Sequence, residues 1–246
     1  MDNTIYVGLS RQIVLQRALD IAANNLANVD TTGFKLEELM ASADPAAPAW
    51  DMGVSAPVTF TMSSGVARDF TEGPLVSTGA PLDLAIEGKG FFQVTTANGP
   101  RYTRDGRFKL DPTGKIVTQD GDPVQGDGGD IVLDPTKGPV TIAPTGVISQ
   151  AGAKVGKLVV VTFDDLSALS KEGSSLYSND SNLTPQPVGG ALVRQGMLEG
   201  SNVQPVVQIT RLIEINRAYD AVTNMVNATS QLATTAIQQL GQATTA

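Results

Sequence analysis

Few side chains in this sequence are suited to catalysis, and those that are belong to acidic residues, Ser, Thr and Lys. The 246 residues include no histidine and no cysteine. This excludes thiol nucleophiles, disulfides, Cys/His zinc sites and the commonest general base. Any chemistry would have to come from an acidic cluster or a phosphate-binding loop.

The acidic run DGDPVQGDGGDIVLD, residues 120–134, is the clearest candidate for a metal site because it contains five aspartates. An EF-hand loop needs Asp or Asn at alternate positions followed by a bidentate Glu. Val124 occupies the third ligand position here, and the Glu is missing. Turns that combine Gly with Asp explain the run, so we expect no metal.

Two other motifs are weaker. Asp164 and Asp165 follow an expected strand, but nothing else in the sequence converges on them, and a turn at the strand end explains them. Gly88-Lys89-Gly90 lacks the spacing of a phosphate loop and favours a tight turn. We therefore expect no enzyme activity, no catalytic residue, no cofactor and no small-molecule substrate.

The charge and hydropathy of the chain limit the classes of partner that it can bind. The formal charge is −8, which disfavours nucleic acid and anionic lipid as partners. No segment approaches the roughly 20 apolar residues of a membrane span. Arg11, Gln12, Gln16 and Arg17 interrupt the first apolar segment, so we expect no cleaved signal peptide.

Both ends of the chain have the pattern of long amphipathic helices. Apolar residues at alternating spacings of four and three, typical of a coiled-coil seam, predict a helix over residues 4–28 and a second of about 37 residues at the other end. The seam residues are Leu15, Leu19, Ala22, Leu26 and Val29, then Leu212, Ile215, Tyr219, Val222, Val226, Thr229, Ala233, Ala236 and Leu240. An ordinary pair of core helices remains the alternative.

The middle of the chain has β character. Short apolar runs separated by turn residues predict strands from Pro74 onwards. Asn98-Gly99 and Asp105-Gly106 predict hairpins, and Phe91-Phe92 should place one ring on each face of a strand. Pro-Thr-Gly occurs at 112–114 and 144–146, which predicts two similar type I turns.

These patterns predict an α+β fold, with long, coiled-coil-like N- and C-terminal helices flanking a mainly antiparallel β central domain. The expected parts are the N-terminal helix at 1–35, an extended connector at 36–73 with a short strand near 58–60, the β domain at 74–200 and the C-terminal helix at 201–246. Residues 203–246 should join the N-terminal helix in one helical layer. The apolar stripes of both helices must be buried against each other, the β domain or other molecules.

Three long motifs resemble the bacterial flagellar rod and hook proteins. They are ANNLANVDTTGFK near the start, GPLVSTGAPLDLAIEGKGFFQV with YTRDGRFKLDPTGKIVTQDGDPVQG in the middle, and QGMLEGSNVQPVVQITRLIEINRAYDAV before the last helix. The chain is short for a hook protein. The run VQGDGGDIVLDP makes it most similar to the proximal rod proteins, with the distal rod proteins as the alternative within the family.

The resemblance implies a structural subunit of the basal-body rod, part of the drive shaft that links the basal body to the hook. Such subunits are exported through the flagellar type III apparatus without a cleaved signal and assemble in the periplasm. Their terminal helices form an inner layer, and their β domains form an outer layer. The implied partners are this chain itself, other proximal and distal rod subunits and the export apparatus.

The motifs and helix seams together suggest the residues of a subunit interface. They are Leu15, Leu19, Asn24, Asn25, Leu26, Asn28, Thr32, Gly33, Phe34, Leu198, Glu199, Ser201, Asn202, Val203, Leu212, Ile215, Tyr219, Val222 and Val226. Two other classes of function stay open at this point. One is a carbohydrate-binding β protein, which would need a carboxylate pair and exposed aromatics; the other is a coiled-coil adaptor that forms a closed dimer.

Overall fold

The computed structural model of the protein describes residues 2–49, 58–173, 175–188, 190 and 192–243. The chain forms two compact units. The first, here called the helical unit, takes in residues 1–27, 37–69 and 204–246. The second, the β unit, takes in residues 28–36 and 70–203. Residues 28–36, which form a polar elbow after the first helix, therefore group with the β strands.

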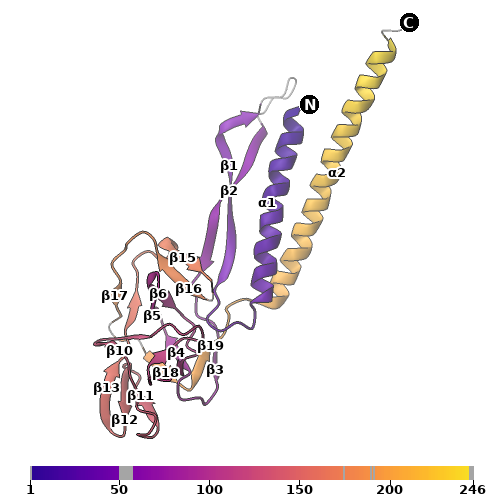
Figure 1. Ribbon diagram of the computed structural model, residues 1–246. Helices are drawn as coiled ribbons and strands as arrows, with labels where there is room; N and C mark the ends of the chain where they lie inside the picture. Colours follow the sequence, from indigo (N-terminus) through magenta and orange to yellow (C-terminus); the bar gives the residue numbers. More distant parts are fainter. Residues whose placement is uncertain (1, 50–57, 174, 189, 191, 244–246) are drawn as a thin grey trace. The chain divides into compact units, whose positions relative to one another are not determined.

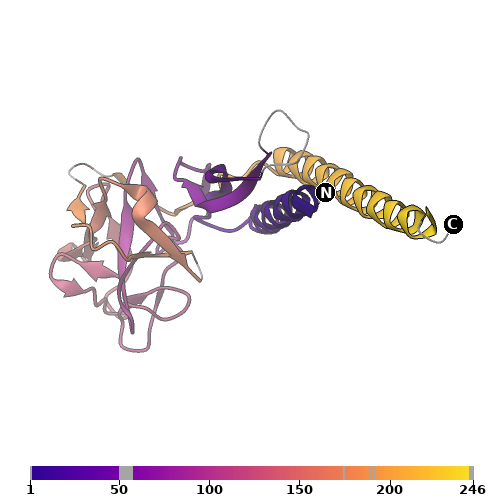
Figure 2. The same ribbon diagram turned by 90° about the horizontal axis from the view of Figure 1, so that it is seen from above.

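In the part of the chain that the structure describes, the helical unit contains two helices and two long strands. Helix α1 spans Asp2–Ala27 and helix α2 spans Pro205–Ala243. The strands β1 (Leu36–Ala49) and β2 (Val58–Asp69) pair with each other. The two helices run side by side in opposite directions, and β2 packs along α1 (Figures 1 and 2). The expected connector is thus extended, but as a paired ribbon.

The two helices approach each other closely at Gly8. A Cβ atom built on Gly8 would lie only 2.5 Å from Cγ2 of Val226, so a side chain there would push the helices apart. One turn further along α1, the side-chain amide of Gln12 donates a hydrogen bond of 2.8 Å to the hydroxyl of Thr223. These contacts fix the antiparallel register of the helix pair.

The β unit consists of short strands joined by turns. The strands are β3 (Leu75–Ser77), β4 (Leu84–Glu87), β5 (Phe91–Thr96), β6 (Gly99–Thr103), β7 (Lys109–Leu110), β8 (Ile116–Val117), β9 (Gln125–Gly126), β10 (Gly129–Asp130), β11 (Val140–Ile142), β12 (Val147–Gln150), β13 (Ala153–Lys157), β14 (Val160–Thr162), β15 (Leu169–Glu172), β16 (Leu176–Asn179), β17 (Gln186–Pro187), β18 (Leu192–Gln195) and β19 (Met197–Glu199). One short 3₁₀ helix, η1, spans Leu166–Ala168.

The strand pairs of the β unit are antiparallel. The largest sheet has the order β15-β16-β6-β5-β14-β17, and a three-stranded sheet has the order β11-β12-β13. Two-stranded pairs join β4 to β18, β3 to β19, β7 to β8 and β9 to β10. Two long terminal helices flanking antiparallel sheets confirm the expected α+β class.

Two apolar clusters lie on opposite faces of β5, as its Phe-Phe pair predicted. Phe92 belongs to a cluster with Leu84, Ile116 and Ile148, whereas Phe91 belongs to a second cluster with Tyr177. Both phenylalanine rings are almost completely buried. Successive side chains of a strand point to opposite faces, so this single dipeptide joins the two halves of the β unit's core.

The turn predictions had mixed outcomes. Asn98-Gly99 lies at the β5–β6 hairpin, and the two Pro-Thr-Gly segments form matching turns, in which Gly114 donates to the carbonyl of Asp111 and Gly146 to that of Ala143. The hairpin predicted at Asp105-Gly106 is wrong. There the carbonyl of Gly106 accepts a hydrogen bond from the amide of Leu84, so the segment pairs with a distant strand end instead of folding back on its neighbour.

The segments weighed as chemical sites have structural roles. Asp165 caps η1 by accepting hydrogen bonds from the amide and hydroxyl of Ser167. In the acidic run, Asp130 pairs with Lys115 at 2.8 Å, and Gly88-Lys89-Gly90 connects β4 to β5. None of the described helices has a stretch long and apolar enough to cross a membrane.

Candidate assembly interface

The elbow that follows α1 is held by polar contacts within the chain. Asn28 accepts two hydrogen bonds from Thr31: its carbonyl takes the amide hydrogen, and its side-chain oxygen takes the hydroxyl hydrogen. Gly33 follows with a φ of +68°, and a Cβ there would lie 2.6 Å from the carbonyl carbon of Arg104. Only glycine fits both the positive φ and this close approach.

Asn25, near the end of α1, is a connecting residue. Its side-chain amide donates to the carbonyl of Glu37 at 2.7 Å, and its side-chain oxygen accepts from the amide of Glu37 at 3.0 Å. The side chain is 1% exposed. This two-point pairing joins the last turn of α1 to the start of β1, which explains why an Asn is kept in a helix that it weakens.

Asn202 plays the same part in the C-terminal motif. Its side-chain oxygen accepts a hydrogen bond of 2.8 Å from the amide of Leu36, and its amide group donates to the carbonyl and hydroxyl of Thr71. Close by, the amide of Gly33 donates to the carbonyl of Glu199 at 2.8 Å. The N- and C-terminal motifs therefore meet in the β unit.

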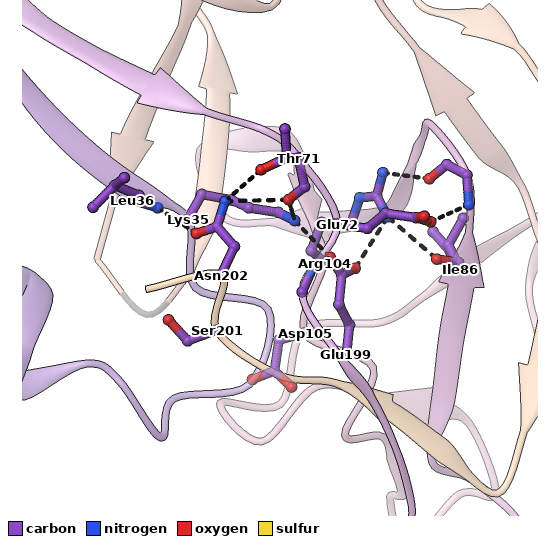
Figure 3. A network of polar contacts seen from close by, with 12 residues as sticks. Lys35, Leu36, Thr71, Glu72, Ile86, Arg104, Asp105, Glu199, Ser201 and Asn202 are labelled. Atoms are coloured by element: carbon purple, nitrogen blue, oxygen red, sulfur yellow. Dashed lines mark hydrogen bonds and ion pairs between the residues drawn. The ribbon is translucent and has the colours of Figure 1, made fainter. Parts of the chain in front are cut away.

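Three charged residues form the buried centre of this meeting point, and we call Lys35, Arg104 and Glu199 the charged joint (Figure 3). The two oxygens of Glu199 accept from the ammonium of Lys35 at 2.5 Å and from the guanidinium of Arg104 at 3.0 Å. The amide of Gly73 also donates to Glu199, at 3.1 Å. The carboxylate of Glu199 is completely buried, so it depends on these donors.

The cations of the charged joint are bound to backbone as well. Lys35 donates to the carbonyl of Thr71 at 2.6 Å, and Arg104 donates to the carbonyls of Ile86 and Gly88. Burial lowers the pKa of Lys35, and the nearby Glu199 carboxylate opposes that shift. Two buried cations thus share one buried anion, and the chain segments that carry them are fixed relative to each other.

The sequence pointed to Glu199 but missed its two partners. Lys35 and Arg104 lie inside the quoted motifs TTGFK and YTRDG, where they were not singled out. The available signal was a lysine flanked by Phe34 and Leu36, since a charge inside an apolar run suggests a buried, paired group. The residues around Lys35 in the sequence do not indicate which carboxylate pairs with it.

The predicted interface residues differ widely in burial. Leu15, Asn25, Gly33, Phe34, Glu199, Ser201 and Val203 are buried; Leu19, Leu26, Asn28, Thr32, Leu198, Asn202, Leu212, Ile215, Tyr219, Val222 and Val226 are half-buried; Asn24 is exposed. The motif residues from Asn28 to Phe34 and from Leu198 to Val203 come together in the β unit. The seam residues of α1 and α2 come together in the helical unit.

A groove of about 300 Å³ lies where the two motifs meet in the β unit. Its walls include Thr32 from the elbow and Leu198 and Ser201 from the C-terminal motif, together with the exposed Val76 of β3. Residues of both motifs therefore line a groove that is open to solvent, and the buried ion pairs of the charged joint connect the same two motifs inside the β unit.

Comparison with known proteins identifies three family regions. Residues 5–35 match the family described as flagella basal body rod protein, residues 85–150 match the flagellar hook protein FlgE/F/G D1 domain, and residues 194–239 match the flagellar basal body rod FlgEFG protein C-terminal region. These regions overlap the three motifs that carried the resemblance.

Similar whole chains carry rod-protein names. The flagellar basal-body rod protein FlgF of Caulobacter vibrioides is 54% identical over 243 residues, which cover 98% of this chain and 99% of that protein. FlgF of Salmonella typhimurium is 33% identical, with 89% of this chain and 91% of that protein covered. FlgG of Bacillus subtilis is 31% identical, with coverages of 94% and 97%.

The similarity to these relatives extends over at least 89% of this chain and at least 91% of each relative. Identity to the named FlgF protein of Caulobacter vibrioides exceeds that to the named FlgG protein, in agreement with the resemblance inferred from the motifs. The carbohydrate-binding and adaptor alternatives are thereby set aside. The chain belongs to the FlgF family of flagellar basal-body rod proteins, whose members are structural, non-enzymatic subunits of the rod.

Proposed function

We propose that this subunit builds the proximal part of the rod by packing its terminal helices against those of neighbouring subunits. Its neighbours would be further copies of this chain and other proximal and distal rod proteins. The proposed interface comprises those motif and seam residues named above that are exposed or half-buried, extended by the outer faces of both helices.

The observation that carries this proposal is the apolar character of those outer faces. On α1, Tyr6, Leu9 and Ile13 are all at least 48% exposed. On α2, the exposed side chains include Val206, Val207, Ile209 and Ile213. Their three- and four-residue spacings place Tyr6, Leu9 and Ile13 on one face, and Val206, Ile209 and Ile213 on another. Contiguous apolar faces of this kind mark contact surfaces.

The test replaces part of one outer face by charge. Because Ile209 and Ile213 are exposed, the double variant Ile209→Glu/Ile213→Glu should keep the stability of the isolated chain within about 0.5 kcal/mol per site. We expect it to be lost from purified basal bodies, measured by immunoblot against other rod subunits. Val155→Glu, which adds the same charged side chain at an exposed apolar site on β13, is the matched control. Normal incorporation of the double variant would refute the proposal.

We also propose that the chain reaches the rod through the flagellar export apparatus with its N-terminal segment retained. Family membership supports this route, and so does the composition of the first 20 residues, whose apolar segment is broken by Arg11 and Arg17. Intact-mass measurement of the chain recovered from basal bodies checks it. We expect the N-terminal helix to be present in full; a chain shortened by the length of a signal peptide would contradict the route.

A further inference from the structure

The helical unit contains a groove with a buried polar atom in its wall that has no hydrogen-bond partner among the described residues. The groove, here called the base groove, is about 200 Å³ in volume and lies between α1, β1 and α2. Ala18 and Ile21 of α1, Leu39 of β1 and Ile215 of α2 supply apolar wall. Gln208 and Arg11 supply polar groups. It is separate from the charged joint, which belongs to the β unit.

Gln208 is the unusual member of this wall. Its side chain is 2% exposed, and its Oε1 atom accepts no hydrogen bond within the described part of the chain. A buried carbonyl oxygen without a donor is destabilising, so native proteins seldom keep one without a reason. The side chain is part of the groove wall, so we take an occupant of the groove as the source of the missing donor.

The other polar groups of the base groove already have partners, with one exception. Asn25 is paired with the backbone of Glu37, and Arg211 is paired with Glu38 at 2.7 Å. Arg11 is exposed and makes no ion pair among the described residues. Arg11 lies beside Gln12, which pairs with Thr223, and Gln208 is 15 residues before Thr223, about 22 Å along the helix, so one group cannot contact both. An occupant should therefore offer a donor to Gln208, which a side-chain amide can supply.

The far end of α2 has the complementary properties. From Ala221 to Ala246 the sequence contains no charged residue. Met225 is 45% exposed and Leu232 is 68% exposed, while Gln231 beside it is also exposed. A helix that faces water normally carries charged residues on its outer face, so an uncharged, apolar-bearing helix end indicates a surface that another protein covers.

The register of the helix pair prevents this end from filling the groove of its own chain. Gly8 lies against Val226, and α1 begins only six residues earlier, so α2 continues past the start of α1 (Figure 1). Ile215, in the base groove, and Leu232 are separated by about 25 Å along one straight helix. A second chain must therefore provide the occupant.

We propose that the uncharged end of α2 from one copy of this chain occupies the base groove of a second copy. Leu232 would lie against Ile21 and Ile215, and the amide of Gln231 would donate to Oε1 of Gln208. The inference rests on the helix-mediated assembly proposed above and specifies one of its contacts. Because groove and helix end are different surfaces, the contact is heterologous, and repeating it produces an open-ended row of subunits.

The absence of cysteine from the chain makes a direct test possible. An epitope-tagged Ala18→Cys chain and an untagged Leu232→Cys chain are produced together in flagellated cells in place of the natural copy, and basal bodies are isolated after mild oxidation. A disulfide requires Cα atoms within about 7 Å, so no intrachain bond can link these two sites. We expect a covalent dimer of one tagged and one untagged chain.

Controls define what would overturn this pairing. Ala18→Cys combined with Val155→Cys, an exposed site on β13, should give no dimer. An adduct of Ala18→Cys with a different rod protein would show that the occupant is not a second copy. Normal rods with no disulfide would refute the groove pairing alone, whereas incorporation of the Ile209→Glu/Ile213→Glu variant would refute the helix-mediated assembly on which it rests.

A second variant tests the role of Gln208 without relying on Cys positions. Gln208→Leu removes the unpaired carbonyl, so the isolated chain should be at least as stable as the natural one in urea unfolding. We nevertheless expect its incorporation into basal bodies to fall about tenfold, because the proposed donor from the second copy loses its acceptor. Gln204→Leu, exposed and one turn earlier, should incorporate normally. Equal incorporation of the two variants would overturn the proposal.

Discussion

At the level of single residues, the charged joint contains two positive groups and one negative group. This imbalance determines how strongly each substitution should destabilise the fold. One fully buried carboxylate, Glu199, neutralises two cations, Lys35 and Arg104, whose side chains are at most 3% exposed. Removing the shared anion would leave two buried cations, whereas removing one cation would leave a complete ion pair. Removing the anion should therefore lower the free energy of unfolding more than removing one cation.

We predict that Glu199→Gln lowers the free energy of unfolding of the β unit by about 3–5 kcal/mol, the usual cost of an unpaired buried charge. Lys35→Met should cost only about 1 kcal/mol, because it removes a buried ammonium together with its hydrogen bonds and leaves the pair of Glu199 with Arg104. Urea unfolding followed by hydrogen exchange of the β strands measures both. An equal or larger loss for Lys35→Met would show that the order is wrong.

The two Pro-Thr-Gly turns provide a matched pair for a pH experiment. In the first turn, the carboxylate of Asp111 accepts hydrogen bonds from the hydroxyl and amide of Thr113 and the amide of Lys115. The Thr113 hydroxyl, with these backbone amides, holds the pKa of Asp111 below its ordinary value of 3.8. In the second turn, Ala143 has the same backbone hydrogen bonds but no carboxylate.

We predict that Asp111→Ala destabilises the β unit at neutral pH and that Ala143→Asp stabilises it. A carboxylate whose pKa is lower in the folded state contributes stability above its unfolded pKa and loses that contribution as the pH falls through the folded pKa. The difference between Asp111→Ala and the natural chain should therefore shrink below pH 3.8. Thermal unfolding between pH 2 and pH 7 checks this; a difference independent of pH would contradict it.

At the level of elements, the close approach of α1 and α2 depends on a residue without a side chain. Glycine inside a helix normally costs about 1 kcal/mol relative to alanine, so Gly8 is tolerated for a packing reason. The methyl group of Val226 occupies the space that a Cβ at Gly8 would need. The outer face and the base groove both rely on this register.

We predict that Gly8→Ala destabilises the helix pair by about 1–3 kcal/mol despite its better helix propensity, because overpacking outweighs the propensity gain. Adding Val226→Ala should restore part of the loss, since it removes the methyl groups that clash. Far-UV circular dichroism of the single and double variants during thermal unfolding measures both steps. A stabilised Gly8→Ala variant would show that the helices are not in close contact there.

At the level of the whole molecule, burial is distributed unevenly between the two units. Both apolar clusters of the β unit are made of side chains that are at most 9% exposed. On α2, by contrast, Gln208 alone among the described side chains is buried. A helix with so little buried surface in the single chain depends on its neighbours for most of its stability.

We predict that amides of α2 in the isolated chain exchange with solvent at least about tenfold faster than those of β5, β6 and β14. In purified rods, α2 should become protected because neighbouring subunits cover its outer faces. Hydrogen exchange measured by mass spectrometry on both forms compares the two states. Protection of α2 in the free chain equal to that of the β strands would show that its order does not depend on assembly.

Features that depend on neighbouring residues along the chain could be predicted from the sequence. Helical spacing predicted α1 and α2, Asn98-Gly99 predicted a hairpin, and Phe91-Phe92 predicted the two faces of β5; the structure confirms each. These signals come from local backbone preference and from side-chain periodicity, which a single sequence displays directly. The family also followed from the sequence, since its motifs are long and occur in order.

Contacts between residues far apart along the chain could not be predicted from the sequence and are known from the folded structure alone. Lys35 and Glu199 are 164 positions apart, and no local signal states that they share one buried site. The wrong hairpin at Asp105-Gly106 has the same origin, since a contact with Leu84 replaced the local turn. The pairing of β1 with β2 and the unpaired oxygen of Gln208 likewise depend on how segments pack, because burial is a property of the assembled chain and not of a residue type.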